Sequence, residues 1–142
     1  DTPTLSFSDI YCEPKPVQQG GVPIWVAGTL NKRNLDRLVR FASGWIPIMG
    51  ATIDDIAAGA KQIGEAWTAA GRDPAGLKVQ APIRIAMDDS GKPDIARSME
   101  SIPELVAAGA TDVNVTLRAF CRDVADAPAV MAELVRRFQS AT

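Results

Sequence analysis

The feature that most constrains the fold of this 142-residue chain is the segment 23–29, PIWVAGT. It is an apolar run that ends at Gly-Thr, and a helical pattern begins directly behind it. Such a run predicts a strand buried on both faces that leads into a helix through a tight turn. A turn of this kind presents backbone N–H groups and a hydroxyl at a helix N-terminus, where an anion such as phosphate is stabilised.

The same strand–helix unit recurs along the rest of the chain. After an irregular lead-in over 1–22, in which 5–11 alternates like a short half-exposed strand, the periodicity predicts strands over 23–28, 44–49, 77–87 and 112–117. Helices are predicted over 31–42, 52–71, 101–109 and from 126 onwards, while 88–100 is polar and unassigned. Four units over 23–142 indicate a single α/β domain with a parallel sheet and right-handed crossovers.

Local signals mark where these helices begin. Asn31 is a candidate N-cap, and the pairs Thr52 with Asp55 and Ser101 with Glu104 have the spacing of a capping box. The second helix is expected to stop at 71–74, GRDP, where glycine precedes proline in the usual order.

Two folds accommodate four such units: a small open sheet covered by helices on both faces, or half of an eight-unit barrel. The two later strands have one apolar face and one polar face, and the second face carries Lys78, Gln80, Pro82, Arg84, Asn114 and Thr116. A polar face fits either a barrel lumen near an active site or a sheet face in water. The residues alone leave these two folds open.

Composition excludes several classes of function. A net charge of −2 with a pI near 5.1 argues against a nucleic-acid surface. No apolar run approaches the roughly 18 residues of a membrane span, and no secretory signal is visible. The chain has no histidine, so we expect no His-based triad and no metal site. Cys12 and Cys121 form no CxxC pair, which favours reduced thiols in the cytoplasm over a disulfide.

Four motifs in order carry a family resemblance: PKPVQ at 14–18, VPIWVAG at 22–28, GWIP at 44–47 and AGRDP at 70–74. Together they resemble the luciferase-like monooxygenase superfamily, and most closely its coenzyme F420-dependent oxidoreductases. The chain is similar to the C-terminal half of that family's pattern. The resemblance implies a partial TIM (β/α)8 barrel made of the four C-terminal βα units, with a deazaflavin or flavin lying across the C-terminal mouth.

The resemblance also implies where the cofactor lies, with coenzyme F420 expected and FMN as the alternative. Members of the family usually carry Gly-Gly at the turn that holds the phosphate-bearing tail, and here the pair is Ala27-Gly28. The expected cofactor-binding residues are Ala27, Gly28, Thr29, Asn31 and Trp45. Trp45 also fits core packing, the commoner role of a strand tryptophan, and Lys32 and Arg33 fit either a solvated helix face or attraction of a phosphate-rich ligand.

Polar residues at or near the C-terminal strand ends are the candidates for contact with a small organic substrate: Arg84, Asn114, Thr116 and Arg118. A solvated face is the alternative for all four. Arg118 is the best placed to meet an anionic group.

The function implied is hydride transfer between F420 or FMN and a small organic substrate, or oxygen activation by a reduced flavin. The ring site belongs to the N-terminal half of the family's barrel, so no catalytic residue is named. Four units alone leave two open strand edges, so we expect a homodimer or a complementary barrel half. The alternatives are a degenerate paralogue and a non-catalytic flavodoxin-like module, whose strand order would reverse at a switch point.

Overall fold

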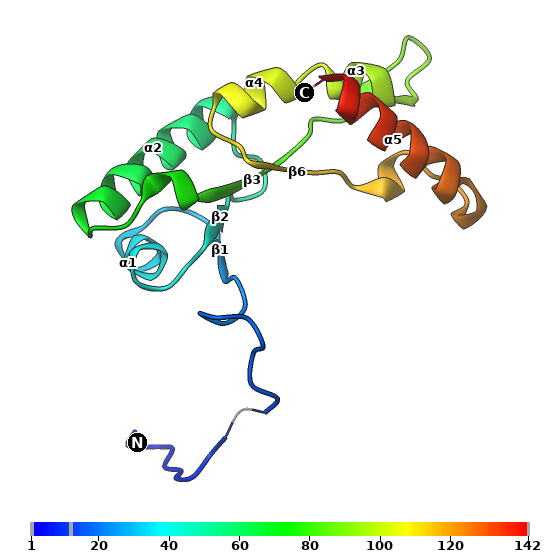
Figure 1. The fold of residues 1–142 in the computed structure, drawn as a ribbon. Coiled ribbons are helices and arrows are strands. Elements are labelled where there is room, and N and C mark those ends of the chain that lie inside the picture. The colour runs from blue at the N-terminus through cyan, green and yellow to red at the C-terminus, as the bar shows by residue number, and fades with distance from the viewer. Residues whose placement is uncertain (1, 12, 142) are drawn as a thin grey trace.

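The computed structural model describes residues 2–11 and 13–141, and its main feature is a parallel four-stranded sheet in sequential order (Figure 1). The strands are β1 (Trp25–Ala27), β2 (Gly44–Ile46), β3 (Lys78–Pro82) and β6 (Asp112–Asn114). Within the described residues, the strands of this sheet lie side by side in the order in which they occur in the chain, without a switch point. This order is that of a barrel wall and not of a doubly wound sheet, so the predicted partial (β/α)8 barrel is confirmed.

Helices alternate with these strands. They are α1 (Lys32–Arg40), α2 (Ile53–Ala69), α3 (Ile95–Met99), α4 (Ile102–Ala107) and α5 (Ala127–Ala141), with single 3-10 turns η1 (Pro74–Gly76), η2 (Leu117–Ala119) and η3 (Val124–Asp126). A small antiparallel pair, β4 (Ala86–Met87) and β5 (Pro93–Asp94), is inserted after β3. Among the described residues, no helix combines the length and apolar character that crossing a bilayer requires.

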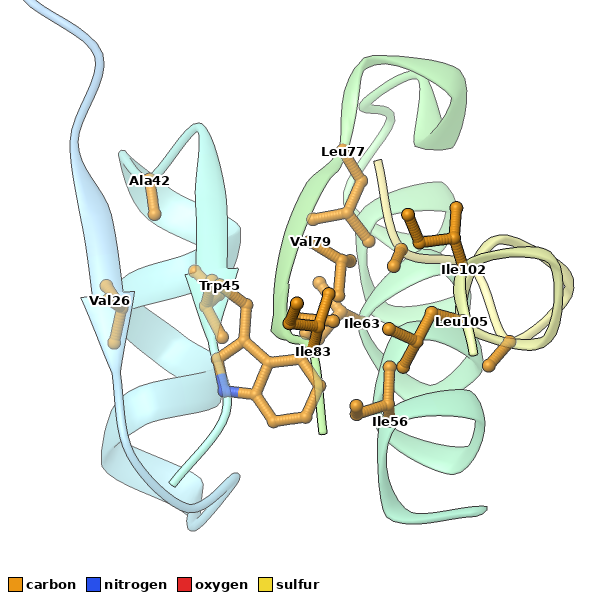
Figure 2. Packing of buried hydrophobic residues seen from close by; sticks show 14 of the residues in the cluster. Val26, Ala42, Trp45, Ile56, Ile63, Leu77, Val79, Ile83, Ile102 and Leu105 are labelled. Atoms are coloured by element: carbon orange, nitrogen blue, oxygen red, sulfur yellow. The ribbon is translucent and has the colours of Figure 1, made fainter. Parts of the chain in front are cut away.

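The core lies between one face of the sheet and the helices. The strand register aligns Val26 with Trp45, Trp45 with Val79, and Ala81 with Val113, so these side chains share a face. Figure 2 shows this face meeting side chains from α2 and α4. The buried members of the cluster in that view include Ile56, Ile63, Ile102 and Leu105.

On β3 and β6 the opposite face of the sheet is largely polar and open, as the pattern of the two later strands predicts. Gln80 pairs with Asp112 and Pro82 pairs with Asn114, and all but the half-buried Gln80 are exposed. In a complete barrel this face lines the lumen. The polar residues of the two later strands therefore lie on the lumen side of a barrel wall.

The strand predicted over 77–87 is wrong beyond Pro82. The apolar alternation persists in burial, since Ile83 is 6% exposed, but the pairing with β6 ends at Pro82. The Ala86 N–H then donates to Ser98 Oγ of α3 at 2.9 Å, and β4 pairs with β5 instead of continuing along β6. The alternation of apolar and polar residues indicates which side chains are buried, whereas strand pairing also requires a neighbouring strand of the same length. The unassigned segment 88–100 contains β5 and α3.

Three further strand predictions are corrected. The strand predicted over 112–117 ends at Asn114, because the chain turns into η2. The half-exposed strand over 5–11 is absent from the described residues, where only an isolated bridge joins Thr2 and Leu5. The first strand is not buried on both faces. It is an edge strand, and Ile24 just before it is 45% exposed.

Two of the three predicted caps are confirmed. Asn31 accepts from the Asn34 N–H at 3.0 Å, and Thr52 and Asp55 form a complete capping box. Ser101 forms no cap: its backbone is already helical, and its hydroxyl donates to the Ser98 carbonyl at 3.0 Å. An N-cap residue normally has an extended backbone. Ser101 follows α3 almost directly and keeps a helical backbone, so its side chain does not cap α4.

The capping box predicts an acid-sensitive contribution to stability. Hydrogen bonds from the Thr52 N–H and hydroxyl lower the pKa of Asp55, the backbone bond being the larger cause. Since the folded chain therefore binds fewer protons, this stability is present above about pH 4 and is lost as pH falls through the lowered pKa. We expect Asp55→Asn to be less stable at pH 7 and to lose less stability below about pH 4, measured as urea midpoints.

The loss of stability at acid pH should become smaller in this variant but should not disappear, because two other carboxylates with a lowered pKa remain. The Lys92 N–H lowers the pKa of Asp88, and the Arg136 side chain lowers the pKa of Glu133. If the urea midpoints of Asp55→Asn and of the parent chain fell equally below about pH 4, the prediction would be contradicted.

Candidate functional site

The candidate site is built around the turn between β1 and α1. Gly28 has φ +103°, which a residue with a side chain rarely adopts, and its N–H donates to the Ile46 carbonyl at 2.9 Å. Its own carbonyl accepts from Trp45 Nε1 at 2.8 Å. The turn is therefore fixed to β2 through both peptide units that flank the Gly28 Cα. The Gly28 N–H is not available to a ligand.

The next N–H groups of the turn remain free to donate. Within the described residues, the N–H groups of Thr29 and Leu30 have no acceptor. The Asn31 side chain accepts the N-cap hydrogen bond of α1, so this residue starts the helix. These two unpaired donors directly precede the N-cap of α1, near the positive end of its dipole.

Asn34, which the sequence reasoning missed, holds the far side of the turn. Its Nδ2 donates to the Thr29 carbonyl at 2.9 Å and reaches the Ala27 carbonyl at 3.5 Å. Its Oδ1 accepts from Arg37 Nη1 at 3.2 Å. A polar amide three residues after an N-cap is the only sequence signal for this role. Ala27 contributes its carbonyl, while its side chain is exposed on the lumen face.

A cavity of about 310 Å³ lies between this turn and α2. Gly28, Thr29 and Trp45 line it, together with Leu30, Ile48, Ala51, Asp55, Ala58, Gly59 and Gln62. The structure thus brings three of the five predicted cofactor residues to one cavity. Because the Asp55 carboxylate is also in its wall, the cavity suits an uncharged part of a ligand and repels an anion.

Trp45 lines the cavity, but most of its side chain is buried in the core. It is 4% exposed, and its indole lies against Gly59 of α2 (Figure 2 shows the ring pointing from β2 towards α2). A Cβ at Gly59 would lie 2.5 Å from Trp45 Cζ3, closer than carbon atoms approach. The bare Gly59 backbone therefore makes room for the ring that holds the Gly28 carbonyl. Trp45 is therefore packed in the core and also lines the cavity.

The predicted substrate residues are only partly brought together. Arg84 lines a second cavity of about 300 Å³ between α2 and α4, with Glu104 in its wall. Asn114 ends β6, and its carbonyl accepts from the Ile83 N–H at 3.0 Å. Thr116 and Arg118 follow at η2, outside both cavities. All four side chains are exposed at the carboxyl-terminal side of the sheet.

Comparison with known proteins gives one family. The sequence profile of the luciferase-like monooxygenases matches residues 3–102, which includes the Gly28 turn, α2 and β3. No curated protein matches the chain significantly. The matched range contains the AGRDP motif, in which Arg72 donates to carbonyls at the end of α1.

Proposed function

Because this chain belongs to the luciferase-like monooxygenase family, we propose that it forms part of an oxidoreductase that binds coenzyme F420, or alternatively FMN. In this proposal the cofactor's phosphate is held at the Gly28 turn. When bound, such a cofactor supplies hydride transfer or oxygen activation, and the protein supplies binding and orientation.

The observation that carries the proposal is the pair of unpaired donors behind Gly28. The Thr29 and Leu30 N–H groups have no acceptor among the described residues, and the space beside Gly28 is open, since a Cβ there would meet only Asn34 Nδ2, at 3.6 Å. An anion at this helix start satisfies both donors and interacts favourably with the dipole. The adjoining cavity, with Asp55 in its wall, takes a neutral part of the cofactor.

The proposal includes a second barrel half, supplied by a longer polypeptide, another chain or a second copy. In support, β1 and β6 are the outer strands of the sheet and the lumen face is open. Unpaired edges and an unfilled lumen are liabilities that a complete barrel removes. The residues that we assign to a small organic substrate are those exposed at the carboxyl-terminal side of the sheet: Arg84, Asn114, Thr116 and Arg118. We place the reaction in the cytoplasm, with no nucleic acid or membrane as partner.

Cofactor titration tests the proposal. The chain, alone and with the polypeptide that completes its barrel, is titrated with F420 and with FMN by fluorescence. Gly28→Ala forces a side chain into a left-handed backbone and reorients the donors, so we expect a loss of affinity of about tenfold or more.

Gly91→Ala is the matched control, because Gly91 also has positive φ (+76°) in open space but lies in the turn between β4 and β5. Its cofactor affinity should equal that of the parent chain. The proposal fails if neither cofactor binds, or if both variants lose affinity equally.

A further inference from the structure

The two outer strands of the sheet each lack a neighbour on one side. Within the described residues, β1 pairs only with β2, and β6 pairs only with β3. All neighbouring strands of this sheet are parallel, and β1 and β6 are each three residues long. The free edge of β1 therefore matches the free edge of β6 in direction and in length, so that one can pair in parallel with the other.

Both edges also carry apolar side chains that the chain itself leaves in solvent. Ile24 lies two residues before the buried Val26 and on the same side of β1, yet it is 45% exposed. At the other edge, α5 lies against α3 and α4 and buries Leu134, whereas Met131 and Val135 are 53% and 56% exposed. Figure 1 shows α1 and α5 on opposite sides of the fold, so these side chains do not cover one another.

The charges at the two edges are of opposite sign. Lys32 and Arg33 are exposed in the first turn of α1, and Asp123 and Asp126 are exposed just before α5. Parallel strands have their carboxyl ends on the same side, so pairing β6 with β1 of a second copy brings these opposite charges to one side of the barrel. Pairing two β1 edges with each other would instead bring together two copies of α1, each with four basic residues and one acidic residue.

We propose that two copies of this chain associate edge to edge into one closed, eight-stranded parallel barrel. In this dimer β6 of each copy pairs with β1 of the other, and a two-fold axis that coincides with the barrel axis makes the two strips of contact identical. The inference rests on the second barrel half of the proposed function, which it identifies as another copy of this chain. Eight strands is the size at which side chains fill a barrel interior.

The dimer also completes the site. The lumen face of β3 and β6 carries Gln80, Asp112 and Asn114 and is open in one copy. In the closed barrel the same face of the second copy lies across the lumen from it. Each copy therefore supplies half of the wall that encloses a substrate.

The test measures the mass of the full chain in solution by sedimentation equilibrium, and the parent chain should be a dimer. Ile24→Asp alters the β1 edge, and Val135→Asp alters the β6 edge. Each should raise the dissociation constant of the dimer at least about tenfold, because a carboxylate is then placed in both strips of an apolar contact. Val106→Asp is the matched control, since Val106 is 52% exposed on α4, away from both edges, and this variant should remain a dimer.

A mixture of the two edge variants tests whether the barrel closes. In a mixed dimer both substitutions fall in one strip, and the other strip is that of the parent chain. The mixture should therefore form dimers at a concentration at which each variant alone is monomeric. A dimer through two β1 edges would instead resist Val135→Asp, and a dimer through two β6 edges would resist Ile24→Asp.

A parent chain that is monomeric at about 100 μM overturns the inference. The proposed function then stands, with another polypeptide as the second half. Edge variants that both remain dimeric, a single edge variant that does so, or a mixture that stays monomeric also overturn the inference. A closed dimer that binds neither F420 nor FMN supports the inference and contradicts the proposed function.

Discussion

Replacing Arg72 with alanine is expected to lower the free energy of unfolding by about 3 kcal/mol. The guanidinium group donates to the carbonyls of Leu38 and Val39 at 2.7 and 2.9 Å through Nη1, and to that of Ala42 at 2.8 Å through Nη2. It also stacks on the Trp67 ring at 3.6 Å. These charge-assisted bonds close the end of α1 against α2. Their loss leaves the Val39 and Ala42 carbonyls without this donor, while the Leu38 carbonyl keeps the Trp67 indole N–H, at 3.0 Å.

Arg136→Ala is the matched control for this change. Arg136 donates to Glu133 at 2.6 to 3.0 Å, so the number of contacts is similar, but its side chain is 62% exposed. An exposed pair of this type contributes less than about 1 kcal/mol. Urea unfolding of the two variants measures the difference. Similar midpoints would show that Arg72 does not join the two helices.

Gly59→Ala is expected to destabilise the chain by about 1–3 kcal/mol, although alanine is the better helix former. The added Cβ would lie 2.5 Å from Trp45 Cζ3 and 3.1 Å from Leu30 Cδ1. The indole has to move, and its hydrogen bond to the Gly28 carbonyl is then lost. We therefore expect cofactor affinity to fall together with stability.

Gly64→Ala on the same helix separates the steric effect from helix propensity. A Cβ at Gly64 would meet only Pro74 Cβ at 3.8 Å, an ordinary contact. This variant should gain about 0.5–1 kcal/mol from propensity alone. Thermal or urea unfolding gives both values. A stabilised Gly59→Ala protein, or one that retains full cofactor affinity, would contradict the role assigned to Trp45.

Signals confined to a few neighbouring residues were predicted well. The caps at Asn31 and Thr52 form because donor and acceptor lie three residues apart, so their spacing can be seen in the sequence. The strand predicted over 44–49 ends at Ile46, directly before Pro47. Proline has no N–H to donate, so this boundary is also a local property.

Features that depend on a partner far along the chain were missed or misplaced. Trp45 and Gly28 are 17 residues apart, and Arg72 and Leu38 are 34 apart. The GRDP motif ends α2 as expected, with Gly71 at φ +74°, but the contact of its arginine with carbonyls at the end of α1 was missed. The strand over 77–87 was overextended, because its alternation reflects burial and says nothing of where β6 stops.

By itself, the sequence determined the alternation of strands and helices, the polar lumen face and the position of the Gly28 turn, because periodicity and backbone preferences are local. Only the tertiary structure decided the sequential strand order, the hydrogen bond from Trp45 that fixes the turn, and the contact of Arg72 with the end of α1. Those contacts join segments whose closeness follows from packing. No spacing within a single segment encodes them.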